Sequence, residues 1–486
     1  MSELNGHFRD RAHFAPTQNY RLLPFRFTKL DDARYVATND VGEHVVMTTD
    51  ELRAFASRRL PVDSDVYRRL KARHFMFDDD SLVAVDLLAL KYRTRAAPIA
   101  NLTALHIFVV TLRCDHSCHY CQVSRQTEER TQFDMSREHA DRALAIAFST
   151  PSPRLKIEFQ GGEPLLNFEL IKYIVGRAHE LNANFRKDLQ FVIASNLTHL
   201  DDEILAFAKA HQLYFSTSLD GPEDIHNVNR PLRGANSQRA ALDGIHRIRE
   251  TLGPRFVSAL MTTTPASLPR ITEIIDEYVT NGFRSIFLRN LSPYGFAVRT
   301  SLVKRYDVDA WIDFYQRGLG HIIEINKRGY RLREELTSIL LQKMFSPSGS
   351  HYVDLQSPAG IAIGALVCNY DGKIYASDEG RMLAEMGDQS LCLGSVETDS
   401  FESVMSNETL VGLLDDTLLE SVPMCTDCAF LPYCGADPVF HRATMGEPVG
   451  HKVFSKFCSK QMAVYRHVIA LLEDDREARD ILMGWI

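Results

Sequence analysis

The sequence has no apolar run of about 18 residues, the length that a membrane-spanning helix requires. It has no excess of basic residues either, because 55 Lys and Arg stand against 63 Asp and Glu. Its first residues, Met1–His7, show none of the apolar core of a signal peptide. We therefore expect a cytoplasmic protein that binds neither a membrane nor a nucleic acid.

The cysteines show no sign of a disulfide framework. Their number, nine, is odd, and they gather in two clusters, which is typical of metal binding in a reducing compartment. The hydrophobic fraction of 45% and the charged fraction of 24% are ordinary for a globular protein. A length of 486 residues is enough for two or three domains.

The most informative motif is a short loop with three cysteines in the spacing C-x3-C-x2-C. The three are Cys114, Cys118 and Cys121. Three thiolates are one ligand short of a tetrahedral zinc site or of the four corners of a four-iron cluster. A cluster held by three cysteines leaves one iron open to a small ligand. The competing interpretation is a zinc loop in which His116 or His119 is a further ligand.

Apolar strands and helices alternate along the middle of the chain. The candidate strands are 105–111, 155–159, 189–195, 214–218, 257–262 and 285–289. The candidate helices are 136–148, 166–181, 201–211, 237–251 and 268–281. This alternation predicts an α/β fold with a parallel sheet, and six strands predict a partial (β/α)6 barrel of the TIM type. In such barrels the chemistry lies at the C-terminal ends of the strands.

Polar segments follow several of these strands, as the cysteine loop does. They are Gly161-Gly162-Glu163-Pro164, Ser195-Asn196, and a stretch with Ser218, Asp220 and Arg230. The two glycines permit a ligand to approach the backbone closely, and the carboxylate of Glu163 suits an ammonium group. The serine and asparagine offer a hydroxyl and an amide, although both residue types are also favoured at turns. Arg230 suits a carboxylate, with a surface salt bridge as the alternative, and Arg289 is a candidate for lining a substrate cavity.

The chain divides into five predicted segments. They are a flexible N-terminus (1–19), a winged-helix-like α+β module (20–100), the partial barrel (101–300), a helical bridge (301–349) and a C-terminal domain (350–486). We expect 20–27 to be a strand of the module and 460–486 to be a final amphipathic helix. The module is either a docking site for a peptide that extends an exposed strand, or an extension that packs on the barrel.

A second cysteine set lies in the C-terminal part. It consists of Cys425, Cys428, Cys434 and Cys458. Four thiolates at this spacing can close around one centre, either a zinc ion or an iron–sulfur cluster. Cys368 and Cys392 remain outside both sets, and we expect them to be buried structural residues.

The first set and the polar segments resemble the radical S-adenosylmethionine (radical SAM) superfamily. The shared features are the cysteine loop with the aromatic Tyr120 before its last cysteine, the Gly161–Pro164 segment and the Ser218–Arg230 stretch. The resemblance implies that the loop holds a [4Fe–4S] cluster whose open iron binds S-adenosylmethionine (SAM). It also implies that SAM is contacted by Tyr120, Gly161, Gly162, Glu163, Pro164, Ser195, Asn196, Ser218, Asp220 and Arg230.

The C-terminal set resembles the SPASM extension of this superfamily, which carries auxiliary [4Fe–4S] clusters. The resemblance implies one auxiliary cluster on Cys425, Cys428, Cys434 and Cys458. A second auxiliary cluster is not expected, because Ser357, Ser377 and Pro438 stand where the extension has cysteines. The polar run 377–382 would then be available to contact substrate.

Over most of its length the chain is similar to the radical SAM maturase of the His-Xaa-Ser peptide system, the B-type component. This similarity implies an oxidoreductase that cleaves SAM to a 5′-deoxyadenosyl radical. The radical would abstract hydrogen from a ribosomally made precursor peptide and install a crosslink or other modification. The implied partners are that peptide, an electron donor such as flavodoxin or ferredoxin, and a companion radical SAM maturase. The alternatives are a SPASM-type maturase of the sulfatase or quinone-cofactor kind, or a zinc-stabilised peptide-binding scaffold.

Overall fold

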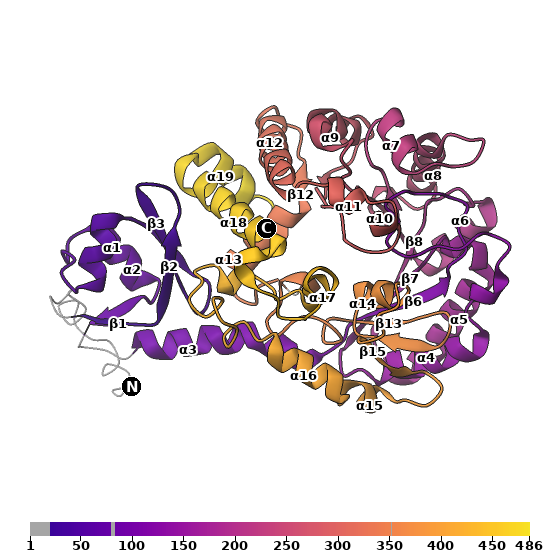
Figure 1. Ribbon diagram of the computed structural model, residues 1–486, viewed down its shortest axis with the longest axis horizontal. Coiled ribbons are helices and arrows are strands. Elements are labelled where there is room, and N and C mark those ends of the chain that lie inside the picture. The colour runs from indigo at the N-terminus through magenta and orange to yellow at the C-terminus, as the bar shows by residue number, and fades with distance from the viewer. Residues whose placement is uncertain (1–19, 79–82, 351) are drawn as a thin grey trace, which may run out of the picture.

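The computed structural model describes residues 20–78, 83–350 and 352–486. The segment 1–19, expected to be flexible, lies outside the described residues. A small N-terminal module is joined to a larger body by one long helix, α3 (Val83–Ala96), which runs along the edge of the molecule (Figure 1). None of the described helices is long and apolar enough to cross a membrane.

The larger body is built on a parallel sheet. Its strands are β6 (Leu105–Thr111), β7 (Arg154–Gly161), β8 (Asp188–Ala194), β9 (Tyr214–Ser218) and β10 (Val257–Leu260). They pair in chain order, each parallel to the next, which confirms the predicted α/β fold. The helices between them are α4 (Arg137–Ser149), α5 (Phe168–Phe185), α6 (Asp202–His211), α7 (Glu223–Asn229) and α8 (Ser237–Thr251).

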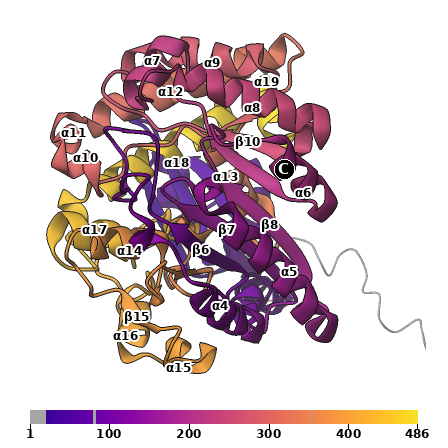
Figure 2. The ribbon, with the colours of Figure 1, turned by 90° about the vertical axis from the view of Figure 1, so that its right-hand side faces the viewer.

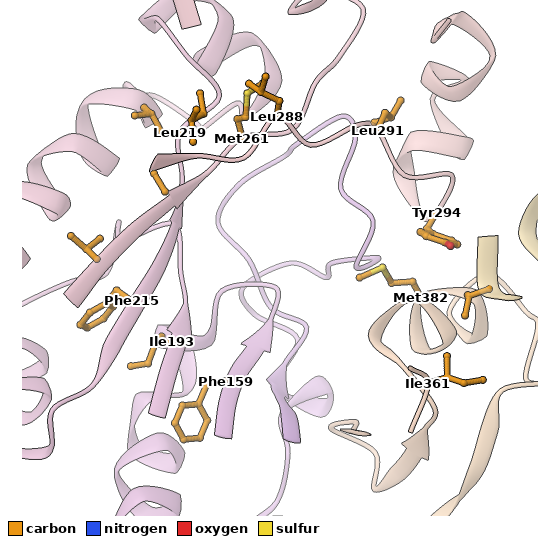
Figure 3. Packing of buried hydrophobic residues seen from close by; sticks show 14 of the residues in the cluster. Phe159, Ile193, Phe215, Leu219, Met261, Leu288, Leu291, Tyr294, Ile361 and Met382 are labelled. Carbon is orange, nitrogen blue, oxygen red and sulfur yellow. The ribbon is translucent and has the colours of Figure 1, made fainter. Parts of the chain in front are cut away.

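Packing against these helices holds the sheet in place (Figure 2). Phe159, Ile193 and Phe215, one from each of three neighbouring strands, lie on the same side of the sheet (Figure 3). Polar side chains begin the helices: Ser136, Asp201 and Asn236 each accept a backbone N–H from the first turn of the helix that follows. The helices therefore start where the sequence predicts them.

The sixth predicted strand, 285–289, is much shorter than expected. Only β11 (Ser285–Ile286) is extended, and it pairs with β12 (Arg333–Glu334) instead of β10. The cause is Glu334, because its buried carboxylate accepts the N–H of Leu288 at 3.2 Å and thereby replaces a strand partner. One backbone bond, from Thr263 N–H to the Arg289 carbonyl (3.0 Å), keeps the segment beside the barrel.

The sheet continues into the C-terminal part of the chain. β13 (Ala365–Cys368) pairs in parallel with β6, and β14 (Lys373–Tyr375) and β15 (Cys392–Ser395) follow in antiparallel order. The result is one eight-stranded sheet. The sequence did not predict this continuation, because strands of three or four residues leave no readable alternation.

The remaining helices follow the barrel in the chain. They include α9 (Ile271–Thr280), α12 (Val308–Lys327), α13 (Glu335–Phe345), α14 (Asp378–Ala384), α17 (Pro438–Met445), α18 (Lys456–Asp474) and α19 (Arg476–Met483). They pack largely on one another, as α9 does on α12, α12 on α18, and α14 on α17. The prediction of a single final helix over 460–486 is wrong, because α18 ends at Asp474 and a second helix, α19, begins after Asp475. The Asp475 carboxylate accepts the Ala478 N–H at 2.9 Å and starts a new helix there.

The N-terminal module has its own core and its own sheet. Its elements are β1 (Tyr20–Leu22), β2 (Phe25–Lys29), β3 (Arg34–Asn39), β4 (His44–Thr48), α1 (Thr49–Ala56), α2 (Asp65–Ala72) and β5 (Met76–Asp78). The strand expected over 20–27 is interrupted before Phe25, so β1 pairs with β5 while β2 joins β3 and β4. Phe55, Tyr67 and Phe75 are fully buried between the sheet and the helices.

Candidate functional site

The ends of the parallel strands enclose a cavity of about 420 Å³. The predicted site residues that line it are Cys114, Cys118, Tyr120, Cys121, Gly161, Gly162, Ser195, Asn196, Ser218 and Arg230. Three other predicted residues, Glu163, Pro164 and Asp220, are buried just behind its wall. Residues far apart in the sequence thus meet at the edge of the sheet where chemistry was expected.

The cysteine loop is anchored by backbone hydrogen bonds to three separate segments. Cys114 N–H donates to the Gln126 carbonyl at 3.0 Å, and Ser117 N–H donates to the Pro231 carbonyl at 2.9 Å. The Cys121 carbonyl accepts the Phe296 N–H at 2.8 Å. These backbone bonds hold the loop in place, and the Cys114 thiol also donates to the Asp115 carboxylate at 3.8 Å.

Burial makes these thiols hard to ionise in the absence of a metal. It raises the pKa of Cys118 to about 12 and raises that of Cys114 well above its usual value. The positive charge of Arg230 acts in the opposite direction on Cys118. Since thiolates are the metal-binding form, a bound cation would have to supply the missing charge compensation.

The two glycines at the end of β7, Gly161 and Gly162, are required by the protein's own chain. A side chain on Gly161 would place its Cβ 1.8 Å from the Thr111 carbonyl, and one on Gly162 would place it 2.2 Å from the Arg113 carbonyl. The sequence predicted that a ligand approaches the backbone closely at these two glycines. In the structure, the close approach on the side of Thr111 and Arg113 is made by the start of the cysteine loop. The glycines fix the distance between that loop and the end of β7.

Glu163 joins the ends of β7 and β8. Its fully buried carboxylate accepts the Ser195 hydroxyl at 2.7 Å and the Asn196 N–H at 2.7 Å. Burial raises its pKa to about 7. The carboxylate expected to receive an ammonium group is therefore occupied by donors of the protein, and it positions the serine and asparagine that line the cavity.

Asp115, inside the cysteine loop, is a site residue that the sequence did not indicate. Its carboxylate accepts the Asn196 amide at 2.7 Å and the Thr198 hydroxyl at 2.6 Å. Burial alone would raise the pKa of Asp115, but hydrogen bonds from His116 and His199 hold it well below its usual range. The loop is thereby tied to the segment after β8.

Asp220, Tyr120 and Arg230 form a buried network at the opposite wall. The fully buried Asp220 accepts the Tyr120 hydroxyl at 2.7 Å and Arg230 Nε at 3.1 Å. The Arg230 guanidinium also lies 5.1 Å from the centre of the Tyr120 ring. The ion pair of Arg230 with Asp220 is therefore buried and is not a surface salt bridge. This pair holds Arg230 in the wall of the cavity, next to the cysteine loop.

A second, smaller cavity adjoins the first and shares part of its wall. The residues common to both are Arg289, Tyr352, Val353, Asp354, Ser377 and Glu379. The far wall includes Asp437, three residues after Cys434, and Lys460, two residues after Cys458. Burial and the charge of Asp354 raise the pKa of Glu379. The polar run that starts at Ser377 thus faces both cavities.

The C-terminal cysteines come together behind this second cavity. Cys425, Cys428 and Cys434 lie on successive turns, and Cys458 lies in the first turn of α18. Burial raises the pKa of every one of them, and the charges of neighbouring thiolates of the set add to the shift in Cys425, Cys434 and Cys458. The four residues are therefore neighbours in space as well as in motif.

The spacing of these thiols disfavours a single zinc ion. At a Zn–S distance of about 2.3 Å, tetrahedral ligands lie roughly 3.8 Å apart. Among the described residues, only Cys114, Asp115 and His116 form a group of three or more potential ligands within 4.8 Å of one another. No three of the C-terminal thiols are that close, which leaves room for the larger core of an iron–sulfur cluster.

The positions that depart from the SPASM pattern have structural roles of their own. The Ser357 hydroxyl donates to Glu420 at 2.8 Å, Ser377 accepts the Gly380 N–H at the start of α14, and Pro438 opens α17. Cys368 is fully buried in β13, and the half-buried Cys392 opens β15. Neither of these cysteines lines the two cavities.

Residues 108–284 match the family described as the Radical SAM superfamily. An uncharacterized protein of Methanocaldococcus jannaschii is 29% identical over 188 residues, which are 38% of this chain and 62% of that protein. An uncharacterized protein of Synechocystis sp. is 21% identical over 354 residues, 70% of this chain and 85% of that protein. The chain thus matches less than two thirds of the length of the first of these relatives.

Two groups of solved structures resemble the fold of most of this chain. Native anSMEcpe with bound AdoMet superposes with a TM-score of 0.64 at 13% identity, over 78% of this chain and 99% of that one. Streptococcus suis SuiB bound to the precursor peptide SuiA gives a TM-score of 0.53 at 14% identity, over 89% and 98%. At this identity the likeness concerns the fold. The match to the Radical SAM superfamily covers residues 108–284, a little over a third of this chain, and includes the three cysteines of the loop.

Proposed function

We propose that this protein is a radical SAM enzyme that modifies a ribosomally made peptide. The observation that carries the proposal is a pair of adjoining cavities. The first is lined by the three-cysteine loop, and the second is lined by Asp437 and Lys460, which follow Cys434 and Cys458 by three and two residues. A substrate residue in the second cavity would lie between the two cysteine sets.

The residues of the first cavity fit a cluster with SAM beside it. Three thiols face a space that is large enough for a ligand, and the Thr217 hydroxyl, 2% exposed, lines it without a hydrogen-bond partner. Such an orphaned hydroxyl is costly unless a ligand satisfies it. When bound, the cluster and SAM would supply a 5′-deoxyadenosyl radical, the agent that removes a hydrogen atom from substrate.

The chain's own contribution is orientation and the exclusion of water. Asp220 holds the Arg230 guanidinium and the Tyr120 hydroxyl, so that this wall of the cavity is rigid. Glu163 holds the end of β8 in register with the cysteine loop. Arg289 and Glu379 offer the substrate a cation and a carboxylate at the junction of the two cavities.

The proposed substrate is a precursor peptide with His-Xaa-Ser repeats. SuiB has been solved with the precursor peptide SuiA, and anSMEcpe with a Kp18Cys peptide, so peptides are bound by proteins of this fold. A crosslink or another side-chain modification would be the product. An electron donor such as flavodoxin or ferredoxin, and a companion maturase, would complete the system.

We assign peptide docking to the N-terminal module, at the edge of β2. The other edge of its sheet is covered, because Arg69 of α2 and Arg73, the residue after this helix, donate to the carbonyls of Val46 and His44 in β4. On β2, by contrast, only the Lys29 carbonyl has a partner outside the sheet in the described part of the chain. The remaining edge is available for an added strand.

The C-terminal cysteines are proposed to hold one auxiliary [4Fe–4S] cluster. The module packs directly on their loop: the Thr38 hydroxyl donates to the Ala429 carbonyl at 2.5 Å, and the Tyr433 hydroxyl donates to the Gly42 carbonyl at 2.7 Å. The auxiliary cluster would therefore be enclosed between the peptide-docking module and the substrate cavity, a place suited to moving electrons.

Iron and sulfide content after anaerobic reconstitution tests the proposal. About eight irons in the wild type and about four in a Cys114/Cys118/Cys121→Ala variant are expected for two four-iron clusters and then one. Release of 5′-deoxyadenosine should disappear in the same variant. About twelve irons would mean that Cys368 and Cys392 contribute to a further cluster. Zinc without colour would refute the enzyme and favour the peptide-binding scaffold.

Modification of a candidate peptide separates the proposed substrate class from other SPASM-type activities. A peptide with His-Xaa-Ser repeats should change mass only in the presence of SAM and reductant. Modification of a sulfatase-type or quinone-cofactor-type peptide instead would keep the radical SAM assignment and reject the His-Xaa-Ser assignment.

A further inference from the structure

Lys343, on α13, is a buried lysine with no carboxylate partner. Its residue is 7% exposed, and its ammonium donates to two backbone carbonyls, those of Leu355 and, at 3.5 Å, Cys434. No ion pair joins it to an acid within 4.0 Å among the described residues. Two neutral carbonyls satisfy its hydrogens only in part, and an ammonium buried without a counter-ion is expensive.

A second cation, Arg95, lies beside Lys343, and the carboxylates that act on these two cations are Glu420 on Lys343 and Glu43 on Arg95. Arg95 of α3 donates to the Lys343 carbonyl at 2.8 Å and to the Pro432 carbonyl at 3.5 Å. Two cations therefore flank the segment that ends in Cys434. Glu420, the nearest carboxylate to influence Lys343, is exposed and accepts the Ser357 hydroxyl. In the described part of the chain, neither of these carboxylates forms an ion pair with Lys343 or Arg95, and Glu43 pairs with Lys91 instead.

The four C-terminal cysteines are the candidate for a buried anion beside Lys343, because Glu420, the carboxylate that also acts on Lys343, is exposed. Lys343 reaches the backbone of one of them, and the charge of the Cys434 thiol acts on Lys343. Bound as thiolates around an iron–sulfur core, four cysteines give the cluster a net negative charge, which grows when the cluster takes up an electron. A fixed cation nearby favours the more negative, reduced form.

We propose that Lys343 is the buried counter-cation of the auxiliary cluster and sets its reduction potential. The ammonium, anchored on the carbonyls of Leu355 and Cys434, stabilises the anionic cluster and stabilises its one-electron-reduced form most. Lys343 acts as a positioning residue and takes no part in bond changes. The inference rests on the proposed auxiliary cluster.

The test uses the full chain with the Cys114/Cys118/Cys121→Ala change, so that the auxiliary cluster is the only one present. Anaerobic redox titration with dithionite, followed by electron paramagnetic resonance, gives the ratio of reduced to oxidised cluster at each potential. K343M is expected to keep about four irons and to lower that ratio about tenfold at a fixed potential, a shift of about 59 mV for one electron. K327M removes an exposed lysine that pairs with Glu324, and should leave the ratio unchanged.

K343R separates charge from packing. If K343M fails to load iron while K343R loads it with a near-parental potential, the need for a cation is supported. If neither variant loads iron, or if K343M loads fully with an unchanged potential, the inference is overturned. A parent without iron would instead refute the auxiliary cluster itself, so the two failures are distinguishable.

Discussion

The two cysteine sets of this protein differ in access and in electrostatic surroundings. The first, with three cysteines, faces a cavity of about 420 Å³ and has carboxylates close behind it, at Asp115 and Glu163. The second, with four partly exposed cysteines, lies beside the N-terminal module and in the first turn of α18, and has Lys343 and Arg95 nearby. A three-cysteine site that faces a cavity can exchange a ligand, whereas a four-cysteine site with cations beside it is suited to holding negative charge.

Removing one cysteine from each set should have the largest effect and test most directly whether the two sets have separate roles. Cys118→Ala is expected to abolish cleavage of SAM, with a loss greater than the roughly 100-fold that follows when a residue orienting a metal ligand is removed. Cys428→Ala should retain SAM cleavage but stop peptide modification. Both are measured as 5′-deoxyadenosine and as peptide mass. Equal loss of SAM cleavage in the two variants would mean that the sets do not act separately.

Asp220→Asn should destabilise the first site alone. It removes the charge that balances Arg230 in the buried network, and loss of one partner of such a pair costs about 3 kcal/mol or more. The urea midpoint should fall and SAM should bind more weakly, while the auxiliary iron stays. Asp202→Asn is the matched control, because its side chain is 99% exposed in a pair with Arg247. A surface pair of this kind is worth less than about 1 kcal/mol.

Glu163 should make the stability of the chain depend on pH. The pKa of Glu163 is about 7 in the folded protein, against an ordinary glutamate value of 4.5, because burial disfavours the charged form, so the folded state binds the extra proton between these two pH values. Stability is therefore complete below about pH 4.5 and falls by about 3 kcal/mol as the pH rises to 7. The free energy of unfolding, measured in urea at several pH values across this range, should fall less with rising pH for Glu163→Gln than for wild type. Glu169→Gln, at an exposed position, should keep the wild-type slope.

The smallest expected effects come from substitutions of two glycines, one near each cysteine set. Gly162→Ala would meet the Arg113 carbonyl at 2.2 Å, and Gly435→Ala would meet the Asp354 carbonyl at 2.1 Å. Each change should cost about 1–3 kcal/mol and reduce iron only in its own cluster. Gly176→Ala, in α5 with no atom within 4 Å of the added Cβ, should be neutral or slightly stabilising. Loss of both clusters in either variant would show that the sites fold as one unit.

The sequence predicted those parts of the fold that local pattern determines. The strands 105–111 and 214–218 have the predicted bounds, because an apolar or alternating run sits between clear turn residues. The helix α3 was not predicted, since none of its residues is buried and it has no apolar face to read. The short sixth strand depends on Glu334, which lies 46 residues beyond the amide that it accepts.

The same limit applies to the site. Motifs brought the cysteines, glycines and Arg230 to one cavity, because strand ends of a parallel sheet meet at one edge. They did not show that Glu163 is engaged by Ser195, or that Asp115 binds Asn196, 81 residues away. Such pairings arise only when separate segments pack, and no spacing in the chain encodes them.

The pairing of β13 with β6 has a consequence for how the chain is made. β6 is an inner strand of the finished sheet, yet one of its neighbours, Ala365–Cys368, leaves the ribosome more than 250 residues later. Until then the nascent barrel presents an unpaired edge on a strand whose residues Ile107–Val110 become buried, a surface prone to aggregation. Chaperones and the iron–sulfur delivery machinery would therefore meet an incomplete barrel during synthesis, and a closed one only after most of the chain has emerged.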